Sequence, residues 1–338
     1  MEYSQCVDAM VPHGWPAFRA GQVFDWVYRK LVADPERMSN LPKAHRQQLA
    51  EAFSFATTQI LGRQSSSDGT QKLLLGWPDE ARAETVMIPD GSRRTACVSS
   101  QVGCPVGCKF CASGIGGLRS NLSAGRIVEQ IFTLNVLLAP LGERITNVVF
   151  MGMGEPLANY EQVVRACRIL HEPRGAGLSY RRVTISTVGV PARMRQLADE
   201  DLPINLAISL HAPTEALRRE LIPWAEHFPL SEILDAARYY FDHTGRELTL
   251  EYVLLAGVND RPEHARKLAA ICKPLRANVN LIWYNEVEGL PFARPSADAV
   301  RAFHQSLLAA GVNAHVRKSR GRDIAAACGQ LRRREQIA

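Results

Sequence analysis

The pattern of apolar and polar positions divides the chain into a helical beginning and a longer alternating part. Near the amino terminus, apolar residues recur at the spacing of one helix face, namely Val23, Trp26, Val27 and Leu31. Ser39 and Asn40 can cap a second helix that runs to about Phe53. The polar run 65–69 then breaks the pattern. We therefore expect a helical accessory domain over residues 1–64.

The rest of the chain alternates between strand-like and helix-like stretches. Three short apolar runs, separated by turn signals, predict strands at 72–77, 84–88 and 95–99. Further strands are expected at 145–151, 182–186, 204–210, 248–255 and 279–284. Amphipathic stretches that predict helices lie near 123–138, 159–171, 190–199, 230–243, 262–275 and 296–310.

Repeated strand–helix units imply a parallel sheet, and this number of units implies a full or partial barrel. The expected fold class is α/β, with a partial (βα)6 barrel of the TIM-like kind behind a small helical N-terminal domain. Residues 65–338 would form the barrel unit, with a strand-rich lead-in at 65–99 and a C-terminal tail at 312–338. Reactive groups on such a fold gather on the loops after the carboxyl ends of the strands.

Composition limits the location and the partners of the protein. The chain has 338 residues, of which 46% are hydrophobic, and a formal net charge of +6. A large core and a polyanionic partner are therefore favoured. The first residues lack the layout of a signal peptide, and no apolar run is long enough to span a bilayer. We expect a cytoplasmic monomer that does not bind membranes.

Basic residues are frequent near both ends of the chain. The segment 317–334 holds seven basic residues and one acidic residue, Asp323. This segment and the helical domain over residues 1–64 can both contact RNA phosphates. For each basic residue taken singly, a solvated surface is the alternative explanation.

Three of the eight cysteines, Cys104, Cys108 and Cys111, form a C-x3-C-x2-C motif. Clustered cysteines favour metal or redox chemistry over an extracellular disulfide framework. Three thiolates are one short of the four that structural zinc or an ordinary iron–sulfur cluster needs. One interpretation is a [4Fe-4S] cluster with one open iron, and the alternative is zinc with Cys97 as fourth ligand. The spacing resembles the signature of radical S-adenosylmethionine (SAM) enzymes, in which the open iron chelates SAM.

Four of the expected strands end in polar loops, at residues 152–156, 186–189, 209–211 and 283–285. Each loop taken alone has a structural explanation, such as a turn, a helix cap or a buried histidine. On one rim of a barrel, however, the loops would line a polar pocket beside the clustered cysteines. That pocket would suit the amino-acid end and the ribose of SAM.

Cys328 differs in its surroundings from the other isolated cysteines. It lies among small residues, next to a glycine and close to basic side chains. Such surroundings would lower the pKa of the thiol and make it a nucleophile. The alternative is a small buried apolar residue, which is the interpretation that we give to Cys167 and Cys272.

The chain resembles, nearly from end to end, the radical-SAM adenine methyltransferases of RNA (RlmN/Cfr type). The resemblance is carried by Trp26, Tyr28 and the segments 18–23, 84–89, 97–104, 152–156, 209–213 and 327–331. The joint presence of the cysteine loop, the upstream Cys97 and the near-terminal Cys328 is more specific than the short motif alone. The resemblance implies a barrel of the radical-SAM type, a [4Fe-4S] cluster on the three clustered cysteines, and SAM. It also implies an RNA substrate and an electron donor such as a flavodoxin-type protein.

The family uses two SAM molecules per turnover. One methylates a cysteine, here Cys328, and the other gives a 5′-deoxyadenosyl radical that takes a hydrogen atom from the cysteine-bound methyl group. The resulting methylene radical adds to the adenine. A second cysteine, here Cys97, releases the product through a transient disulfide, and Glu84 has the position of the base that removes the ring proton. By the same matching, the residues expected to contact SAM are Gly154, Glu155, Ser186, Ser209, Leu210, His211 and Asn285.

The resemblance leaves two target carbons. The family methylates carbon 2 or carbon 8 of an adenine in 23S ribosomal RNA, and the carbon-2 branch also acts on tRNA. Segments 112–118 and 284–285 are closer to the carbon-8 branch, whereas residues 155–156 favour carbon 2. We expect carbon 2, with carbon 8 as the alternative. An interpretation from another class is a non-catalytic zinc-containing RNA-binding protein, which leaves Cys328 unexplained.

Overall fold

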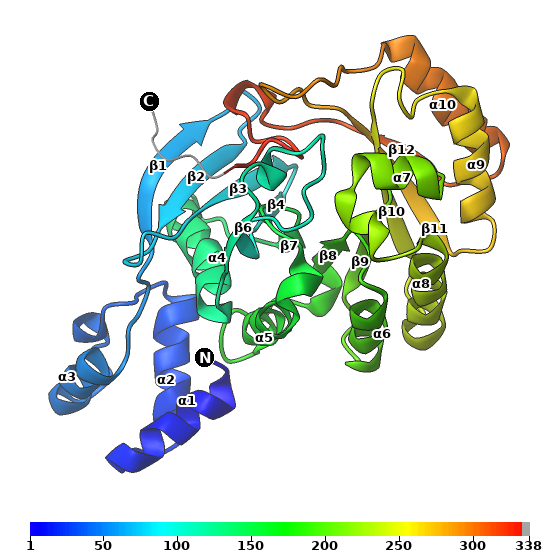
Figure 1. Ribbon diagram of the computed structural model, residues 1–338. Coiled ribbons are helices and arrows are strands. Elements are labelled where there is room, and N and C mark those ends of the chain that lie inside the picture. The colour runs from blue at the N-terminus through cyan, green and yellow to red at the C-terminus, as the bar shows by residue number, and fades with distance from the viewer. Residues whose placement is uncertain (333–338) are drawn as a thin grey trace.

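A curved, mostly parallel sheet forms the centre of the molecule (Figure 1). The computed structural model describes residues 1–332. Seven strands run parallel in the order β4-β7-β8-β9-β10-β11-β12. Their bounds are β4 Arg93–Cys97, β7 Asn147–Phe150, β8 Val183–Thr187, β9 Asn205–Ser209, β10 Leu248–Leu254, β11 Ala277–Trp283 and β12 Ala314–Arg317. Among the described strands, β12 does not pair with β1, so the barrel is open.

Helices that follow the first six of these strands confirm the expected (βα)6 arrangement. Their bounds are α4 Ala124–Leu138, α5 Tyr160–His171, α6 Pro191–Asp199, α7 Glu215–Leu221, α8 Leu230–Thr244, α9 Pro262–Cys272 and α10 Ala297–Ala309, with α7 as an extra turn before α8. In α4, the Ser123 hydroxyl accepts the Arg126 N–H, which caps the helix. Ile127, Ile131 and Leu134 recur at helical spacing and are buried against the sheet.

The lead-in adds three antiparallel strands to one edge of the sheet. These are β1 (Gln59–Ser65), β2 (Gln71–Gly76) and β3 (Arg82–Asp90), and β3 pairs with β4. Leu73, Leu75 and Val86 are fully buried, so the lead-in belongs to the main core. The expectation of helix up to residue 64 is wrong, because β1 takes its hydrogen bonds from β2, a partner that local periodicity does not reveal.

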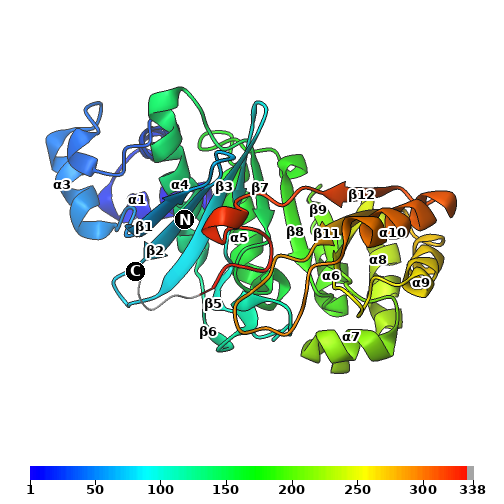
Figure 2. The same ribbon diagram turned by 90° about the horizontal axis from the view of Figure 1, so that it is seen from above.

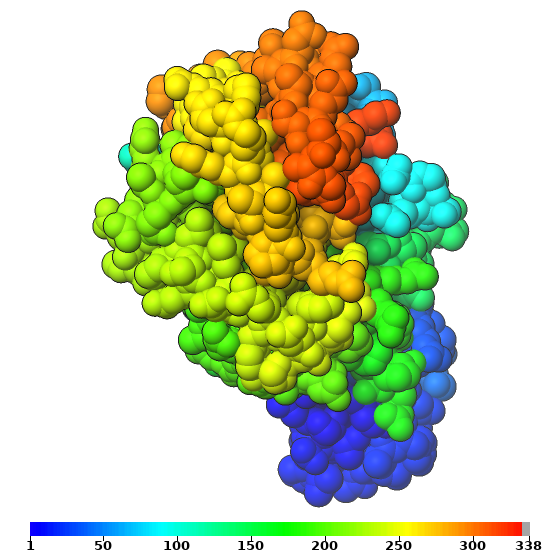
Figure 3. All heavy atoms as spheres, turned by 90° about the vertical axis from the view of Figure 1, so that its right-hand side faces the viewer, coloured from blue at the N-terminus to red at the C-terminus, as the bar shows by residue number. Residues whose placement is uncertain are grey.

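The N-terminal helices α1 (Tyr3–Met10), α2 (Phe18–Phe24) and α3 (Lys43–Ala52) enclose a small core of their own. They project from one end of the barrel, as Figures 1 and 3 show. The segment between α3 and β1 is hydrogen-bonded to Glu129 of α4. The Glu129 carboxylate accepts the Thr57 N–H at 3.0 Å and also the Trp77 indole N–H at 2.9 Å. None of the helices in residues 1–332 is long and apolar enough to cross a membrane.

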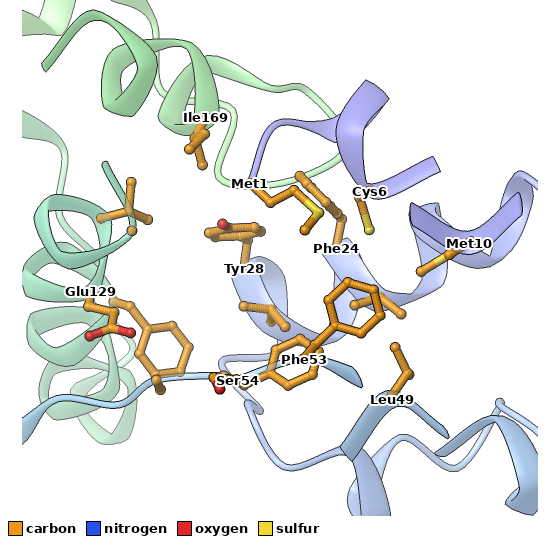
Figure 4. A pocket seen from close by; sticks show the side chains of 17 residues that line it. Met1, Cys6, Met10, Phe24, Tyr28, Leu49, Phe53, Ser54, Glu129 and Ile169 are labelled. Carbon is orange, nitrogen blue, oxygen red and sulfur yellow. The ribbon is translucent and has the colours of Figure 1, made fainter. Parts of the chain in front are cut away.

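A cavity of about 170 Å³ lies between the N-terminal helices and α4 (Figure 4). Its walls are mainly apolar, with Phe24, Leu49, Phe53 and Phe132 among them. None of the residues expected to bind a cofactor lines it. The cavity is therefore separate from the polar loops of the barrel.

After β12 the chain turns back across the open sheet toward the lead-in strands (Figure 2). This tail, residues 318–332, is anchored near its beginning by the turn between β1 and β2. The Gly321 N–H donates to Asp68 Oδ2 at 3.0 Å, and the Ser67 N–H donates to Asp323 Oδ2 at 3.1 Å. The two ends of the barrel sequence therefore meet, although no strand pairing closes the described sheet.

Candidate active site

The loops after β7, β8, β9 and β11 meet at one edge of the sheet, as expected for parallel strands. Glu155 joins the first two loops, because its carboxylate accepts the Leu157 N–H at 2.9 Å and the Val188 N–H at 2.8 Å. Burial raises the pKa of Glu155 to about 7, and the two amide hydrogen bonds oppose that rise. The carboxyl group therefore titrates near neutral pH.

Gly154 allows the first of these loops to approach the segment that leads into the cysteines. Its φ of 106° is one that side chains rarely permit, and a Cβ there would lie 2.7 Å from both Ser100 Oγ and Gln101 Cβ. The next residue is held by the same segment, because the Glu155 N–H donates to Gln101 Oε1 at 2.8 Å.

The loops after β8 and β9 supply hydroxyl and imidazole groups. The Ser186 and Ser209 hydroxyl oxygens are 3.2 Å apart. The N–H groups of Leu210 and His211 donate to one carbonyl oxygen of β10, at 3.0 and 3.2 Å. Burial lowers the pKa of His211 to about 3, and its Nδ1 accepts the Val253 N–H at 3.1 Å. The His211 ring is therefore neutral at physiological pH.

Asn285, after β11, connects the rim to the tail. Its side-chain N–H donates to the Cys328 carbonyl oxygen at 3.2 Å. Its buried Oδ1 has no hydrogen-bond partner among residues 1–332. An unpartnered buried acceptor costs free energy, so a donor group on a ligand would fit this position.

The cysteine loop follows β5 (Gln101–Gly103) and precedes β6 (Leu118–Asn121), which pair with each other. Cys104, Cys108 and Cys111 pack against one small apolar cluster. Cys104 accepts hydrogen bonds from the main chain of the loop itself and of the neighbouring loop 152–156, and Cys111 accepts them from the turn that follows it. Burial raises the pKa of all three thiols.

The donor set of this loop fits an iron–sulfur cluster. Thiolates are the usual ligands of such a cluster, and N–H groups aimed at the sulfurs stabilise the ligated form. Within the described part of the chain, no three histidine, cysteine, aspartate or glutamate side chains have the arrangement of a site for a metal ion. The fit therefore rests on the thiols and on the amide groups around them.

Cys328 and Cys97 lie in one neighbourhood, although they are more than 200 positions apart in the sequence. Charges on Cys111, Glu251 and Cys97 act on the Cys328 thiol. Loops surround the Cys328 thiol, although the residue as a whole keeps exposed surface and is not packed in the apolar core.

The expectation of a lowered pKa for Cys328 is wrong. Burial, followed by Cys111, Glu251 and Cys97, raises the pKa of Cys328 to about 12, and Arg317 only partly opposes this. The thiol faces acidic groups of the rim, whereas the sequence suggested that it faces the cations of the tail. Burial also raises the pKa of Cys97 to about 12.

The tail is hydrogen-bonded directly to the cysteine loop. The Ala112 N–H donates to the Gly329 carbonyl oxygen at 2.8 Å, and the Ser113 hydroxyl donates to the Leu331 carbonyl oxygen at 2.6 Å. Cys328 is therefore held beside the cysteine loop by main-chain contacts on its C-terminal side. Arg333 and Arg334, also expected to contact RNA, lie outside the described residues.

Glu84 lies on β3 and is buried, with both carboxylate oxygens engaged. Oε1 is 3.1 Å from Lys72 Nζ, and Oε2 accepts the Arg332 N–H at 2.8 Å. Lys72 was missed at the sequence level, because only the register of β2 and β3 brings it diagonally opposite Glu84.

Two further buried charged residues were not foreseen. Arg218 of α7 is almost inaccessible, donates to the Val188 carbonyl oxygen, and lies close enough to Cys108 to act on its charge. Glu251 of β10 accepts the Asn280 side-chain N–H at 2.9 Å. A charged residue inside a strand or on an apolar helix face is the only sequence signal for either.

Comparison with known proteins identifies the family. Residues 98–269 match the family described as Radical SAM superfamily, and residues 2–54 match the Ribosomal RNA large subunit methyltransferase N-terminal domain. A protein of Symbiobacterium thermophilum is 47% identical over 99% of this chain and 91% of its own length. One of Thermosynechococcus vestitus is 46% identical over 96% and 95%. Both are named probable dual-specificity RNA methyltransferase RlmN.

A solved structure agrees with this assignment. The crystal structure of a radical SAM methyltransferase from Sphaerobacter thermophilus covers 98% of each chain at 43% identity, with a TM-score of 0.96. The relatives and this structure confirm an enzyme and contradict the zinc-containing, non-catalytic interpretation. The chain thus belongs to the RlmN family of radical SAM RNA methyltransferases.

Proposed function

We propose that this protein methylates carbon 2 of an adenine in 23S ribosomal RNA, and of an adenine in tRNA, with a methyl group carried by Cys328. Relatives of 43–47% identity bear the name dual-specificity RNA methyltransferase. The main structural support is the position of the tail, because Cys328 lies within the electrostatic reach of Cys97 and Cys111. A purely structural tail would have no need for an accessible thiol at this point.

The cofactors follow from the donor groups on the rim. Cys104, Cys108 and Cys111 would hold a [4Fe-4S] cluster, and SAM would be contacted by Gly154, Glu155, Ser186, Ser209, Leu210, His211 and Asn285. When bound, the cluster would supply the electron for reductive cleavage of SAM, with a flavodoxin-type protein as its donor, and two SAM molecules would be used per turnover. Neutral His211 and the free Oδ1 of Asn285 add hydrogen-bonding groups without adding charge.

The protein's own groups carry the rest of the reaction. Cys328 presents the methyl group to the open space beside the rim, and Glu84 accepts the proton from the ring carbon. Cys97 then loses its proton and attacks the Cys328 sulfur, and the carbon–sulfur bond breaks with its electron pair on the carbon. The carbon takes up a proton to become the methyl group, and a disulfide remains. A pKa of about 12 keeps both free thiols protonated at neutral pH, so each must give up its proton in the step in which it reacts.

Nucleoside mass spectrometry tests the proposal. The anaerobically reconstituted enzyme is incubated with SAM, a reductant and 23S ribosomal RNA or tRNA, and the RNA is digested to nucleosides. We expect 2-methyladenosine from both RNAs. 8-Methyladenosine would support the carbon-8 alternative, and an absence of any methylated adenosine with the loaded enzyme would contradict both.

A further inference from the structure

The ion pair between Lys72 and Glu84 is enclosed by the tail. Each side chain is only 4% exposed. Lys72 Nζ also donates to the Ala325 carbonyl oxygen at 3.1 Å, and Glu84 Oε2 accepts the Arg332 N–H at 2.8 Å. The tail therefore contacts the pair on both sides of Cys328, three residues before it and four residues after it.

Burial makes the charge of Lys72 important for its partner. A carboxylate removed from water is strongly disfavoured unless an opposite charge or hydrogen bonds compensate it. Without the ammonium group, Glu84 Oε1 would lose its partner, and the carboxylate would keep only the Arg332 N–H on Oε2. Its position would then be less firmly fixed.

We infer that Lys72 is a positioning residue for the methyl transfer. Its ion pair holds the Glu84 carboxylate on the side of β3 that faces the tail, and its hydrogen bond to Ala325 ties this arrangement to the docked tail. The inference rests on the role proposed for Glu84 as proton acceptor. Before that step the adduct radical would give up its unpaired electron, for which the bound cluster would be the acceptor. The C–H bond of the target carbon then breaks, its electron pair restores the aromatic ring, and the proton passes to Glu84 Oε2. Oε1 remains paired with Lys72.

A structural ion pair that only joins β2 to β3 is the competing explanation. The two explanations differ in the step that fails when the charge is lost. A structural role predicts a general loss of folded protein, whereas a positioning role predicts a block after the carbon–carbon bond has formed. Covalent protein–RNA adduct is therefore the decisive readout.

The experiment uses the cluster-loaded full-length enzyme with SAM, a reductant and target RNA. Lys72→Gln keeps a donor for Ala325 but removes the charge, Lys72→Arg keeps the charge, and Lys273→Gln is the control at an exposed lysine. We expect Lys72→Gln to form one adduct per active site and to release it about 100-fold more slowly, the size of a general-base contribution. Lys72→Arg should recover most of the rate, and Lys273→Gln should match the unaltered enzyme.

Iron content and melting temperature, measured alongside, show whether each variant is folded. If Lys72→Gln does not fold, Lys72→Arg is compared with Lys72→Met, and only Lys72→Met should accumulate adduct.

If folded Lys72→Gln releases the adduct at the normal rate while Glu84→Gln does not release it, the role of Lys72 alone is overturned. Normal release by Glu84→Gln would instead overturn the proposed role of Glu84. If both residues act in one step, the double variant Lys72→Gln/Glu84→Gln should release the adduct no more slowly than Glu84→Gln alone.

Discussion

At the scale of single residues, the same functional group has different properties at different positions. Cys167 and Cys272 are thiols buried in the apolar core, with raised pKa values. Cys104 and Cys111 are half-buried, and main-chain N–H groups point at their sulfurs. Cys328 alone among the described cysteines is exposed. The environment, and not the residue type, therefore separates the cysteines into groups that match the inert, ligating and reactive roles that we propose for them.

Replacement of single cysteines should separate cluster binding from release of the protein–RNA adduct. Cys108→Ala should lose the brown colour and the iron, because two thiolates remain for the cluster. Cys97→Ala should keep both, because Cys97 lies on β4 outside the loop. Iron analysis and absorption spectra of anaerobically purified proteins measure this. Equal iron loss in the two variants would show that Cys97 is a ligand.

The two remote cysteines should fail at different steps. Cys328→Ala should give neither adduct nor methylated RNA. Cys97→Ala should form the carbon–carbon bond but should not release the RNA, so the protein should remain cross-linked to it. A denaturing gel before and after ribonuclease detects the shifted band, and peptide mapping locates the link. Mapping to Cys6, Cys167 or Cys272 would refute the assignment.

The pKa of Glu155 makes a prediction about stability. The folded pKa of about 7 lies above the ordinary value of 4.5, so the folded protein binds the proton more tightly than the unfolded chain. This contribution is complete below pH 4.5 and is lost as the pH rises through 7, with an upper limit of about 3 kcal/mol. The melting temperature of Glu155→Gln should therefore fall less between pH 5 and pH 8 than that of the unaltered protein. Parallel curves for the two proteins would contradict the prediction.

At the scale of elements, the short sheet of β5 and β6 holds the cysteine loop by close main-chain contact. Gly103, the last residue of β5, has a φ of 79°, and a Cβ there would lie 2.0 Å from the Gly117 carbonyl oxygen. That oxygen accepts the Cys104 N–H at 3.2 Å. The first ligand of the predicted cluster is therefore positioned by a glycine that tolerates no side chain.

Alanine at Gly103 should disturb the loop more than alanine at a comparable glycine. Gly142 has a φ of 69°, and a Cβ there would meet nothing within 4 Å, so Gly142→Ala measures the backbone strain alone. We expect Gly103→Ala to cost about 2 kcal/mol more than this control, from overpacking against main chain. It should also lose iron. Melting temperatures and iron content check both effects, and equal behaviour of the two variants would contradict the close contact.

At the scale of the whole molecule, a net charge of +6 and a basic tail favour contact with RNA. The N-terminal helices project from the barrel on one side, and the tail crosses the open sheet (Figures 1 and 2). The N-terminal helices lie in the segment 2–54 that matches the ribosomal RNA methyltransferase N-terminal domain, and the tail is rich in basic residues. We therefore expect these two surfaces to contact RNA phosphates.

RNA affinity should therefore fall steeply as salt rises. Replacement of Arg332, Arg333 and Arg334 by glutamine should weaken binding and reduce the salt slope by up to about 2–3. SAM cleavage without RNA should persist. The control replaces Arg266, Lys267 and Lys273, exposed cations on or just after α9, and should leave binding unchanged. Affinity that is independent of salt, or equal losses in the two variants, would remove the electrostatic role of the tail.

The sequence alone determined the elements with strong periodicity and the residues with unusual spacing. Six βα units were predicted with boundaries within a few residues, because each helix carries an apolar stripe and each strand an apolar run. The strand β12, with four residues, and the helix α7, with seven, were not predicted, because such short segments carry too little periodicity. The clustered cysteines were visible because their ligands lie within one short loop.

Only the tertiary structure decided which distant groups meet and what their surroundings do to them. Lys72 pairs with Glu84 through strand register, and the tail closes over both because residues near Asp68 anchor it. The raised pKa of Cys328 follows from burial and from acidic neighbours on other strands, whereas its sequence neighbours suggested the opposite. Local sequence sets secondary-structure propensity and the spacing of side chains. The electrostatic surroundings of a group, its burial and its distance from remote residues depend on long-range packing, which a short stretch of sequence does not reveal.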